Sequence, residues 1–279
     1  MALEDRIARS RLIPPRPRPT WVRRPRVEAR LREALEAPVT VVKADPGYGK
    51  STAVAQTLSY GPWPYLWYSL TEADRDPQRF LAHWIYAFQS LDPRLGRSAA
   101  ERLHEPGGFA ALDALANDLV DRLSRETVLV LDDYHLADSS EIRALLERWL
   151  EQIPPALHLV LITRHDPELR GSARARAHGE LREITTADLA FTPEEVQELF
   201  AAQGLPLSPE AARRLAEETE GWIIALWMIL HHLRESGPQA METLLDRLPE
   251  ALPDLFAYLA EEVLTRQPEP VQRFLLRTS

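Results

Sequence analysis

The chain has 279 residues, of which 45% are hydrophobic, and a formal net charge of −9 at pH 7. This length favours two domains and allows a full apolar core. Cys is absent, which excludes disulfides, thiolate zinc sites and thiol catalysis. The N-terminus lacks an apolar signal core and no run approaches the ~20 apolar residues of a membrane span, so we expect a soluble, cytoplasmic protein without a membrane partner.

The first 32 residues form a basic arm. They hold ten Arg against Glu4, Asp5 and Glu28, a balance of +7, so the remainder of the chain carries −16. Such an arm could hold a polyanion, or it could fold back on the acidic body of its own chain. Because the whole chain is acidic, we expect no bulk DNA binding by it.

A phosphate-binding loop follows the first predicted strand. The sequence PVTVVKADPGYGKST matches the Walker A pattern, with Ala44 in place of its first Gly. A loop whose N–H groups face phosphate oxygens needs Gly47 and Gly49 at positive φ. Lys50 would reach the β- and γ-phosphates, Ser51 would bind Mg²⁺, and the next helix would direct its N-terminus at the anion. The residues expected around the nucleotide phosphates are Asp45, Pro46, Gly47, Tyr48, Gly49, Lys50, Ser51 and Thr52.

Short β-branched or aromatic runs then alternate with helical patterns, which indicates a parallel α/β sheet. The predicted strands cover residues 40–44, 65–69, 128–132, 157–163 and 182–185. The predicted helices between them cover 76–89, 108–125 and 139–152. Asp76, followed by Pro77, and Ser139 are the expected N-terminal caps of two of these helices.

The run TVLVLDDYH, residues 127–135, is an apolar strand that ends in two carboxylates, as in a Walker B motif. Asp132 would emerge beside the phosphate loop and bind Mg²⁺, and Asp133 would polarise an attacking water. In ATPases with a strand inserted between the two Walker strands, that strand carries the group that senses the γ-phosphate. The strand at 157–163 places Arg164 there, and a guanidinium can bind phosphate bidentately without losing its charge.

After residue 187 the strands stop and helical patterns follow. Thr192 and Glu195 form a predicted capping box, and Ser208 repeats the cap at the next helix. Further helical patterns cover 222–234, 241–248, 253–266 and the residues from 270 on. We therefore predict an α/β domain to about residue 190 and then an all-helical domain, in a chain that we interpret as a piece of a longer protein.

The Walker motifs belong to a longer series of strings that the chain carries in order. They are ADPGYGKST, LVLDDYHL, LVLITRHDPEL, ARARAHGELREI, DLAFTPEEVQELF, EGWIIAL and YLAEEVLTRQPEPVQRFLLRTS. Together they resemble the nucleotide-binding module of the MalT-like, LuxR-type transcriptional regulators, which are STAND-class P-loop ATPases. The resemblance implies a P-loop domain with its basic arm at 1–190, a helical domain at 191–255 and the start of a truncated winged-helix domain at 256–279.

The resemblance also implies a function. Such a regulator holds ADP when silent, exchanges it for ATP with Mg²⁺ when an inducer binds, and then self-associates and activates transcription. Slow hydrolysis of ATP, a weak ATPase activity, would reset this state. Inducer and promoter DNA would be bound by regions absent from this chain.

The family pattern assigns roles to single residues. The matches to its P-loop, Walker B and sensor positions are Lys50, Ser51, Asp132, Asp133 and Arg164. Val22 would flank the adenine, and Arg24 resembles the N-terminal Arg that lies near the nucleotide, a place that Arg23 or Arg26 could take instead. In the helical domain, Ile223 stands where many STAND relatives have Pro.

Two other classes of function stay open from the residues alone. An AAA+-like motor or loader would need an Arg finger from a second subunit and a turnover stimulated by nucleic acid or protein. A P-loop kinase would need an acceptor pocket with a dedicated base.

Overall fold

A computed structural model describes residues 7–16 and 21–236 of the chain. The chain divides into two compact units, Met1–Leu189 and Ala190–Ser279. The helices predicted at 241–248, at 253–266 and from 270 on, like the winged-helix start predicted at 256–279, lie outside the described residues. Within the described ranges, no helix is both long enough and apolar enough to cross a bilayer.

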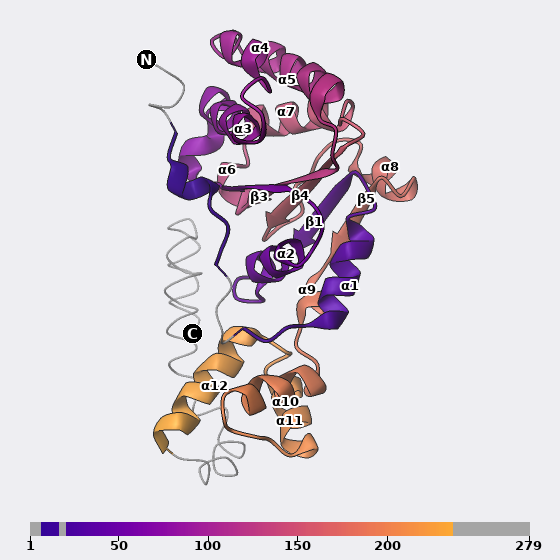
Figure 1. The fold of residues 1–279 in the computed structure, drawn as a ribbon. Coiled ribbons are helices and arrows are strands. Elements are labelled where there is room, and N and C mark those ends of the chain that lie inside the picture. The colour runs from indigo at the N-terminus through magenta and orange to yellow at the C-terminus, as the bar shows by residue number, and fades with distance from the viewer. Residues whose placement is uncertain (1–6, 17–20, 237–279) are drawn as a thin grey trace, which may run out of the picture. The chain divides into compact units, whose positions relative to one another are not determined.

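The first unit is built on a parallel sheet of five strands in the order β2-β3-β4-β1-β5. The strands are β1 (Val39–Lys43), β2 (Tyr65–Ser69), β3 (Thr127–Asp132), β4 (Leu157–Thr163) and β5 (Leu181–Ile184). β4 therefore lies between the Walker A strand β1 and the Walker B strand β3 (Figure 1). This order confirms the predicted α/β fold with its inserted strand.

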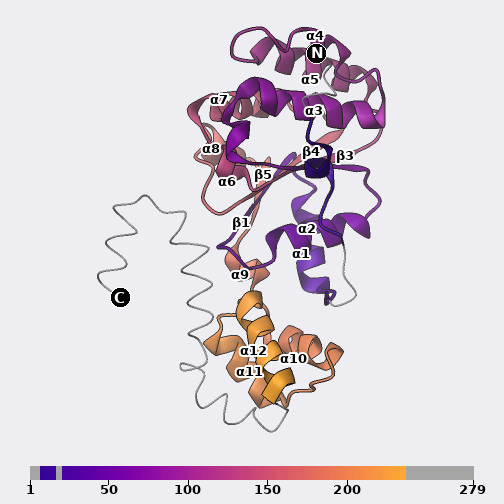
Figure 2. The same cartoon turned by 90° about the vertical axis from the view of Figure 1, so that its left-hand side faces the viewer.

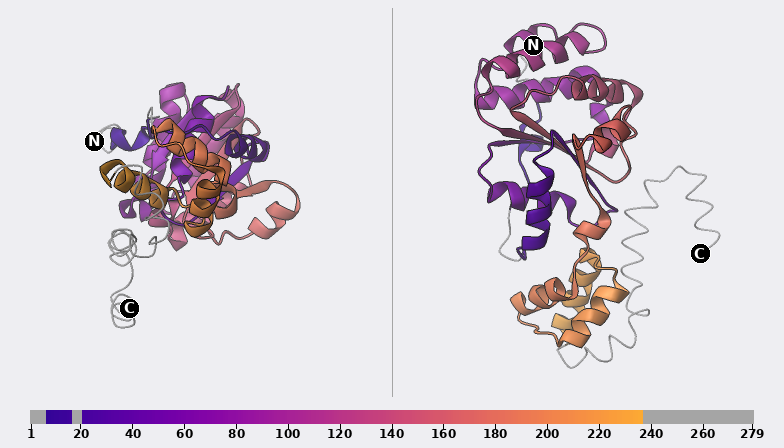
Figure 3. Two further views of the ribbon diagram at one scale, coloured as in Figure 1. Left: turned by 90° about the horizontal axis from the view of Figure 1, so that it is seen from below. Right: turned by 90° about the vertical axis from the view of Figure 1, so that its right-hand side faces the viewer.

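Helices cover both faces of the sheet. On one face lie α3 (Pro77–Leu91), α5 (Phe109–Arg122) and α7 (Ser140–Leu150) (Figure 1, Figure 2 and Figure 3). On the other face lie α1 (Pro25–Ala34) and α2 (Lys50–Ser59). Strands covered on both faces need continuous apolar runs, and β3 is buried along its whole length. The first layer packs with large aromatic rings, since Trp84 and Trp149 meet edge to face at 5.3 Å.

The expected caps start two helices of this unit, α3 and α7. The Asp76 carboxylate accepts from the Arg79 amide at 2.7 Å, and the Ser139 hydroxyl accepts from the Ile142 amide at 3.3 Å. Both satisfy an N–H group that has no partner inside the helix. The sequence analysis did not name the short helices α4 (Arg97–Glu101), α6 (Tyr134–Ala137), α8 (Ser172–Ala177) and α9 (Thr186–Leu189), nor the 3₁₀ turns η2 (Arg9–Leu12) and η3 (Glu72–Arg75).

The described part of the second unit consists of helices. They are α10 (Pro193–Ala202), α11 (Pro209–Glu218) and α12 (Ile223–Ser236). Thr192 and Glu195 form the predicted capping box at α10. Gly221 has φ +65° between α11 and α12, and a Cβ there would lie 2.4 Å from the backbone nitrogen of Phe191. That amide donates to the Gly221 carbonyl at 3.0 Å, so the close approach requires glycine.

The start of the basic arm folds against the edge strand β2. Arg11 in η2 donates from Nε to the Ser69 carbonyl at 2.9 Å and forms an ion pair with Asp74. The fully buried Asp74 carboxylate also accepts from the Tyr68 hydroxyl at 2.7 Å and from the Thr71 amide at 2.7 Å. Of the two interpretations of the arm, these contacts support folding back on an acidic body. They also cover part of a sheet edge that would otherwise be open.

Asp74→Asn is expected to lower the free energy of unfolding at pH 7 by about 3 kcal/mol, because it leaves the Arg11 guanidinium in a buried site without its counter-charge. Burial raises the pKa of Asp74, but the hydrogen bonds from Arg11, Tyr68 and Thr71 outweigh it and hold the pKa below its ordinary value. The ionised carboxylate therefore stabilises the fold above the ordinary value near 3.8, and this stability is lost as pH falls through the lowered pKa. Urea denaturation at pH 7 and at pH 3 measures both effects.

Asp92→Asn is the control, since Asp92 pairs with Arg94 at the surface. It should change the denaturation midpoint much less. An equal loss in the two variants would contradict the importance of the buried network.

Candidate nucleotide-binding site

The loop between β1 and α2 curls around the ammonium group of Lys50. Gly47 and Gly49 have φ values of +82° and +76°, as the motif predicted, and Gly49 is the N-cap of α2. Lys50 Nζ donates to the Ala44 carbonyl at 2.7 Å and to the Asp45 carbonyl at 3.0 Å. The two left-handed glycines thus let the loop close on the side chain that follows it.

The end of β3 meets the start of α2. Ser51 Oγ donates to Asp132 Oδ1 at 2.7 Å, and the Asp133 amide donates to the same oxygen at 3.0 Å. Only 5% of Asp132 is exposed. Burial and then the negative charge of Asp133 raise the pKa of Asp132 to about 7, against the two hydrogen bonds. The carboxylate is therefore costly to ionise in the absence of a cation.

Four further charges act on Lys50. Burial, followed by the positive charge of Arg164, lowers the pKa of Lys50 to about 8, while Asp133, Asp132 and Asp45 act in the opposite direction. The fold thus brings Arg164, from the end of β4, into electrostatic range of the loop lysine. All four charged residues predicted to act on the phosphates, Lys50, Asp132, Asp133 and Arg164, therefore gather at the carboxyl edge of β1, β3 and β4.

Asp133 has an unusual backbone conformation. Its φ is +55°, in the left-handed region that non-glycine residues seldom adopt, and it is the N-cap of the short helix α6. Strain of this kind persists only where the surroundings enforce it, and it clusters at functional sites. The geometry is compatible with the predicted role of Asp133 toward water, which stays a prediction.

The arginines before and in α1 hold the end of the first unit. Arg24 is buried, and its Nη1 donates to the Leu189 carbonyl at 2.8 Å. Arg26 Nη1 donates to the Asp188 carbonyl at 2.9 Å. Arg23 forms a bidentate pair with Glu28 at 2.7 and 2.8 Å. These contacts give Arg24 a place at the exit of the α/β unit, and its predicted contact with a nucleotide stays a prediction.

Val22 precedes α1 and is half-buried. Its predicted place against an adenine also stays a prediction. In the phosphate loop itself Tyr48 is buried, Asp45 is exposed, and Pro46, Ser51 and Thr52 are half-buried.

The donors at the site suit a hard cation. Magnesium is commonly bound through one or two protein oxygens, with phosphate oxygens and waters completing the octahedron. The Ser51 hydroxyl and the Asp132 carboxylate, 2.7 Å apart, are oxygen donors of this kind. Among the described residues, no group of three or more His, Asp or Glu side chains forms a metal cage of its own. The residues therefore fit a cation that arrives with a phosphate.

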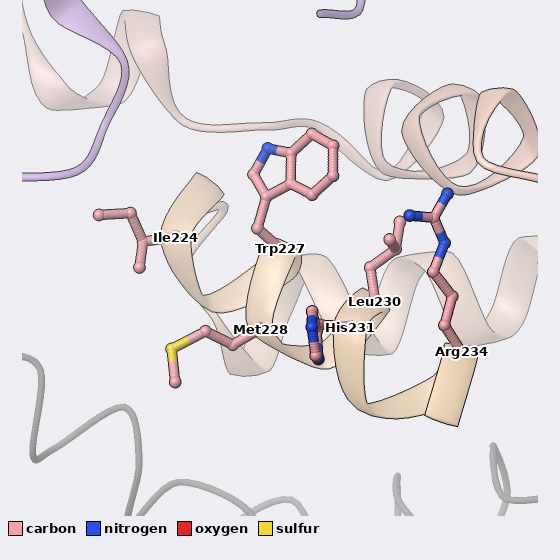
Figure 4. Close-up of a pocket in the computed structure, with 6 residues that line it drawn as sticks. All are labelled: Ile224, Trp227, Met228, Leu230, His231 and Arg234. Atoms are coloured by element: carbon pink, nitrogen blue, oxygen red, sulfur yellow. The ribbon is translucent and has the colours of Figure 1, made fainter. Parts of the chain in front are cut away.

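A hollow of about 330 Å³ lies on α12 in the second unit (Figure 4). Its lining is mostly apolar and consists of Ile224, Trp227, Met228, Leu230, His231 and Arg234. The described residues of this lining include no carboxylate or hydroxyl, so they offer none of the oxygen ligands that Mg²⁺ prefers.

Sequence reasoning missed the charged residues behind Arg164. Lys43, Asp166, Arg176 and Glu183 form linked ion pairs across β1, the loop after β4, α8 and β5. The alternation of acidic and basic residues in the string HDPELRGSARARA indicates ion pairs, but it does not show which residues pair. Pairing depends on the sheet order, which places β1 between β4 and β5.

Asp132→Asn is expected to stabilise the protein in the absence of nucleotide and cation. The folded pKa near 7 lies above the ordinary 3.8, so the protonated carboxyl favours the fold at low pH. This contribution declines as pH rises from about 4 and is lost above about 7. The gain from Asn should therefore be near zero at pH 4 and on the order of 2–4 kcal/mol at pH 8.

Thermal unfolding across this pH range measures the gain. Asp113→Asn is a control of opposite sign, because the hydrogen bond from Arg148 holds the pKa of Asp113 below its ordinary value. A gain for Asp132→Asn that is the same at pH 4 and pH 8 would show that Asp132 is not held in a desolvated state.

Comparison with known proteins gives the site its context. No model of a known protein family matches the sequence. The chain is 34% identical over 261 residues to the HTH-type transcriptional regulator MalT of Serratia proteamaculans and 32% identical over 260 residues to that of Yersinia pestis. Each match covers 92% of this chain and 28% of the relative, so the chain spans little more than a quarter of the length of these regulators.

Two solved structures share the fold. A STAND protein with a tetratricopeptide repeat sensor from Pyrococcus horikoshii aligns with a TM-score of 0.52 at 18% identity, over 78% of this chain and 30% of that one. A Walker-type ATPase of Pyrococcus abyssi aligns with a TM-score of 0.55 at 16% identity, over 92% of this chain and 79% of that one. The chain is thus a homologue of part of the MalT-type transcriptional regulators, and it shares the fold of these two ATPase structures.

Proposed function

We propose that this chain is the nucleotide-binding switch module of a transcriptional regulator, with ADP and ATP as its ligands and Mg²⁺ as the cation. The observation that supports this most is the gathering of Lys50, Asp132, Asp133 and Arg164 at one edge of the sheet, around a loop with two left-handed glycines. Both buried charges, on Lys50 and on Asp132, have shifted pKa values that a phosphate and a cation would reverse.

In this proposal Lys50 binds the β- and γ-phosphates, and the backbone N–H groups of the loop from Gly47 to Thr52 surround them. Ser51 and Asp132 hold Mg²⁺, which would neutralise phosphate charge when bound. Asp133 orients the water for a slow hydrolysis. Val22 and Arg24 flank the base and sugar side of the nucleotide.

Arg164 is the proposed sensor of the γ-phosphate. It lies after β4, the strand between the two Walker strands, and its charge acts on Lys50. ATP and ADP would differ in what they offer this guanidinium. A ligand can shift a conformational equilibrium only through its different affinities for the two states, so the sensor must bind the two nucleotides unequally.

Three further roles are proposed for parts that the relatives have beyond the region this chain matches. The relatives are named transcriptional regulators of the helix-turn-helix type, and this chain matches 28% of their length. We propose that self-association in the ATP state, inducer binding and promoter binding require those further parts.

Lys50→Ala is expected to weaken ADP and ATP binding by more than about tenfold, since it removes the charge that faces the phosphates. Isothermal titration calorimetry with Mg²⁺ measures the affinity. Arg213→Ala is the control, because Arg213 pairs with Glu210 and Glu217 on α11 at the surface and should leave affinity unchanged. Unchanged affinity in the Lys50 variant would refute the phosphate-loop assignment.

Arg164→Ala is expected to reduce the ratio of ATP affinity to ADP affinity by about fivefold or more, while ADP affinity stays within about twofold of wild type. The reason is that only ATP carries the group that Arg164 is proposed to bind. Competitive displacement of a fluorescent ADP analogue gives both affinities. Arg174→Ala, at an exposed position of α8, is the matched control. A preserved ratio in the Arg164 variant means that another residue senses the γ-phosphate.

A further inference from the structure

Four charged side chains of the first unit, Lys43, Asp166, Arg176 and Glu183, form an ion-pair network next to the candidate site. Lys43 Nζ lies 3.5 Å from Asp166 Oδ2, and Arg176 Nη2 lies 3.0 Å from the same oxygen. Arg176 also donates from Nε to Glu183 Oε1 at 2.8 Å. The four residues come from β1, the loop after β4, α8 and β5 respectively. One carboxylate oxygen is therefore shared by cations from two different elements.

Two members of this ion-pair network, Lys43 and Asp166, lie close in sequence to residues with proposed roles. Lys43 precedes Ala44, whose carbonyl accepts from Lys50. Asp166 follows Arg164 by two residues, on the loop that leaves β4. Glu183 lies one residue before the end of β5, and β5 leads into α9. The ion pairs thus connect β1 and the loop after β4, residues 164–171 (the sensor loop), to β5, the last strand in sequence.

Arg176 is the central residue of the ion-pair network. It contacts Asp166, Glu183 and the hydroxyl of Ser172, at 3.3 Å from Nη1. Its single guanidinium therefore connects the sensor loop to β5. Such a planar fork of five donors can hold two carboxylates in fixed directions, which a lysine ammonium cannot.

The other side of the same loop is held by α7. Arg143 Nη1 lies 3.5 Å from Glu168 Oε2, and the Arg170 amide donates to Glu147 Oε1 at 2.8 Å. Glu168 has φ +45°, so the loop backbone is turned sharply at this point. The loop is thus fixed toward α7 by one set of contacts and toward β5 by another, and the two sets can be removed separately.

Short polar contacts connect the end of β5, through α9, to the last residues of the first unit. The Asp188 carboxylate accepts from the Thr185 amide at 2.8 Å, and Arg24 and Arg26 hold the carbonyls of Leu189 and Asp188. A displacement at the end of β5 would therefore reach the last residues of the unit through short contacts. Each partly exposed ion pair contributes little to the stability of the fold. This ion-pair network is therefore better suited to positioning β5 than to stabilising the fold.

We propose that Arg176 is a positioning residue that transmits the nucleotide state from the loop of Arg164 to β5 and α9. The proposal rests on the nucleotide switch proposed above. When Arg164 binds a γ-phosphate, Asp166 moves with it. The distances from the Asp166 carboxylate to Lys43 and to Arg176 then change. The ion pair between Arg176 and Glu183 then changes its geometry, and the end of β5 moves with Glu183.

Hydrogen–deuterium exchange of the whole chain tests this, with Mg²⁺ and either ADP or a non-hydrolysable ATP analogue. In wild type, the two nucleotides should give different exchange in peptides covering 164–171 and in peptides covering 181–189. Arg176→Gln should keep the difference at 164–171 and reduce the difference at 181–189 by at least about twofold. Arg176→Lys should restore part of it, because the charge returns without the fork.

Arg174→Gln on the same helix is the matched control and should leave both differences intact, and calorimetry should give ADP affinities within about twofold of wild type for all variants. If wild type binds both nucleotides and Arg176→Gln keeps the full difference at 181–189, the role of Arg176 is refuted while the nucleotide switch stands. Loss of ADP binding together with both differences in Arg176→Gln would assign Arg176 to the fold instead. Absence of nucleotide binding in wild type would refute the proposed function itself.

Discussion

A hydrogen bond between Ser51 and Asp132 joins the two halves of the candidate site. Ser51 Oγ and Asp132 Oδ1 are 2.7 Å apart although 81 residues separate them in sequence. The distance is possible because β4 brings β1 and β3 to a common edge and because α2 starts directly after Gly49. The contact joins the start of α2 to the end of β3, and it is one of the two hydrogen bonds that lower the pKa of Asp132 against its burial.

Burial dominates the electrostatics of the site, and the Ser51 hydrogen bond acts against it at Asp132. A carboxylate at the end of a fully buried strand is desolvated, and a second carboxylate beside it adds repulsion. A lysine folded into its own loop is desolvated as well, with a guanidinium nearby. Groups in such surroundings weaken the fold and become favourable only with ligands of opposite charge. The desolvated Lys50 and Asp132 therefore lower the stability of the fold, as charged groups at binding sites commonly do.

Much of this arrangement could be predicted from local patterns. The Walker strings specify a strand, a turn and a helix within about fifteen residues, and caps such as Asp76 and Thr192 act within one helical turn. The insertion of β4 was expected from the type of ATPase that the motifs indicate. Long-range polar contacts were not predictable in this way.

Arg24 meets Leu189 across 165 residues, and Arg176 meets Glu183 and Asp166 only because of the position of α8 beside β5. Charged side chains have no periodicity that reveals such partners. Short helices such as α6 and α9 have too few residues to show an apolar face. Their existence depends on the turns that precede them, as at Asp133 with its positive φ.

The insertion of β4 also determines when the site can form during synthesis. β3 can pair with β2 as soon as residue 132 has been made, but β1 pairs with β4 and β5, both of which come later in the chain. The phosphate loop is therefore complete in sequence long before its own strand has a neighbour in the sheet. A nascent chain that ends before Leu157 contains both Walker motifs and no strand to join them. Closure of such long-range contacts is the slow part of folding, so the site becomes competent late, after most of the first unit has been translated.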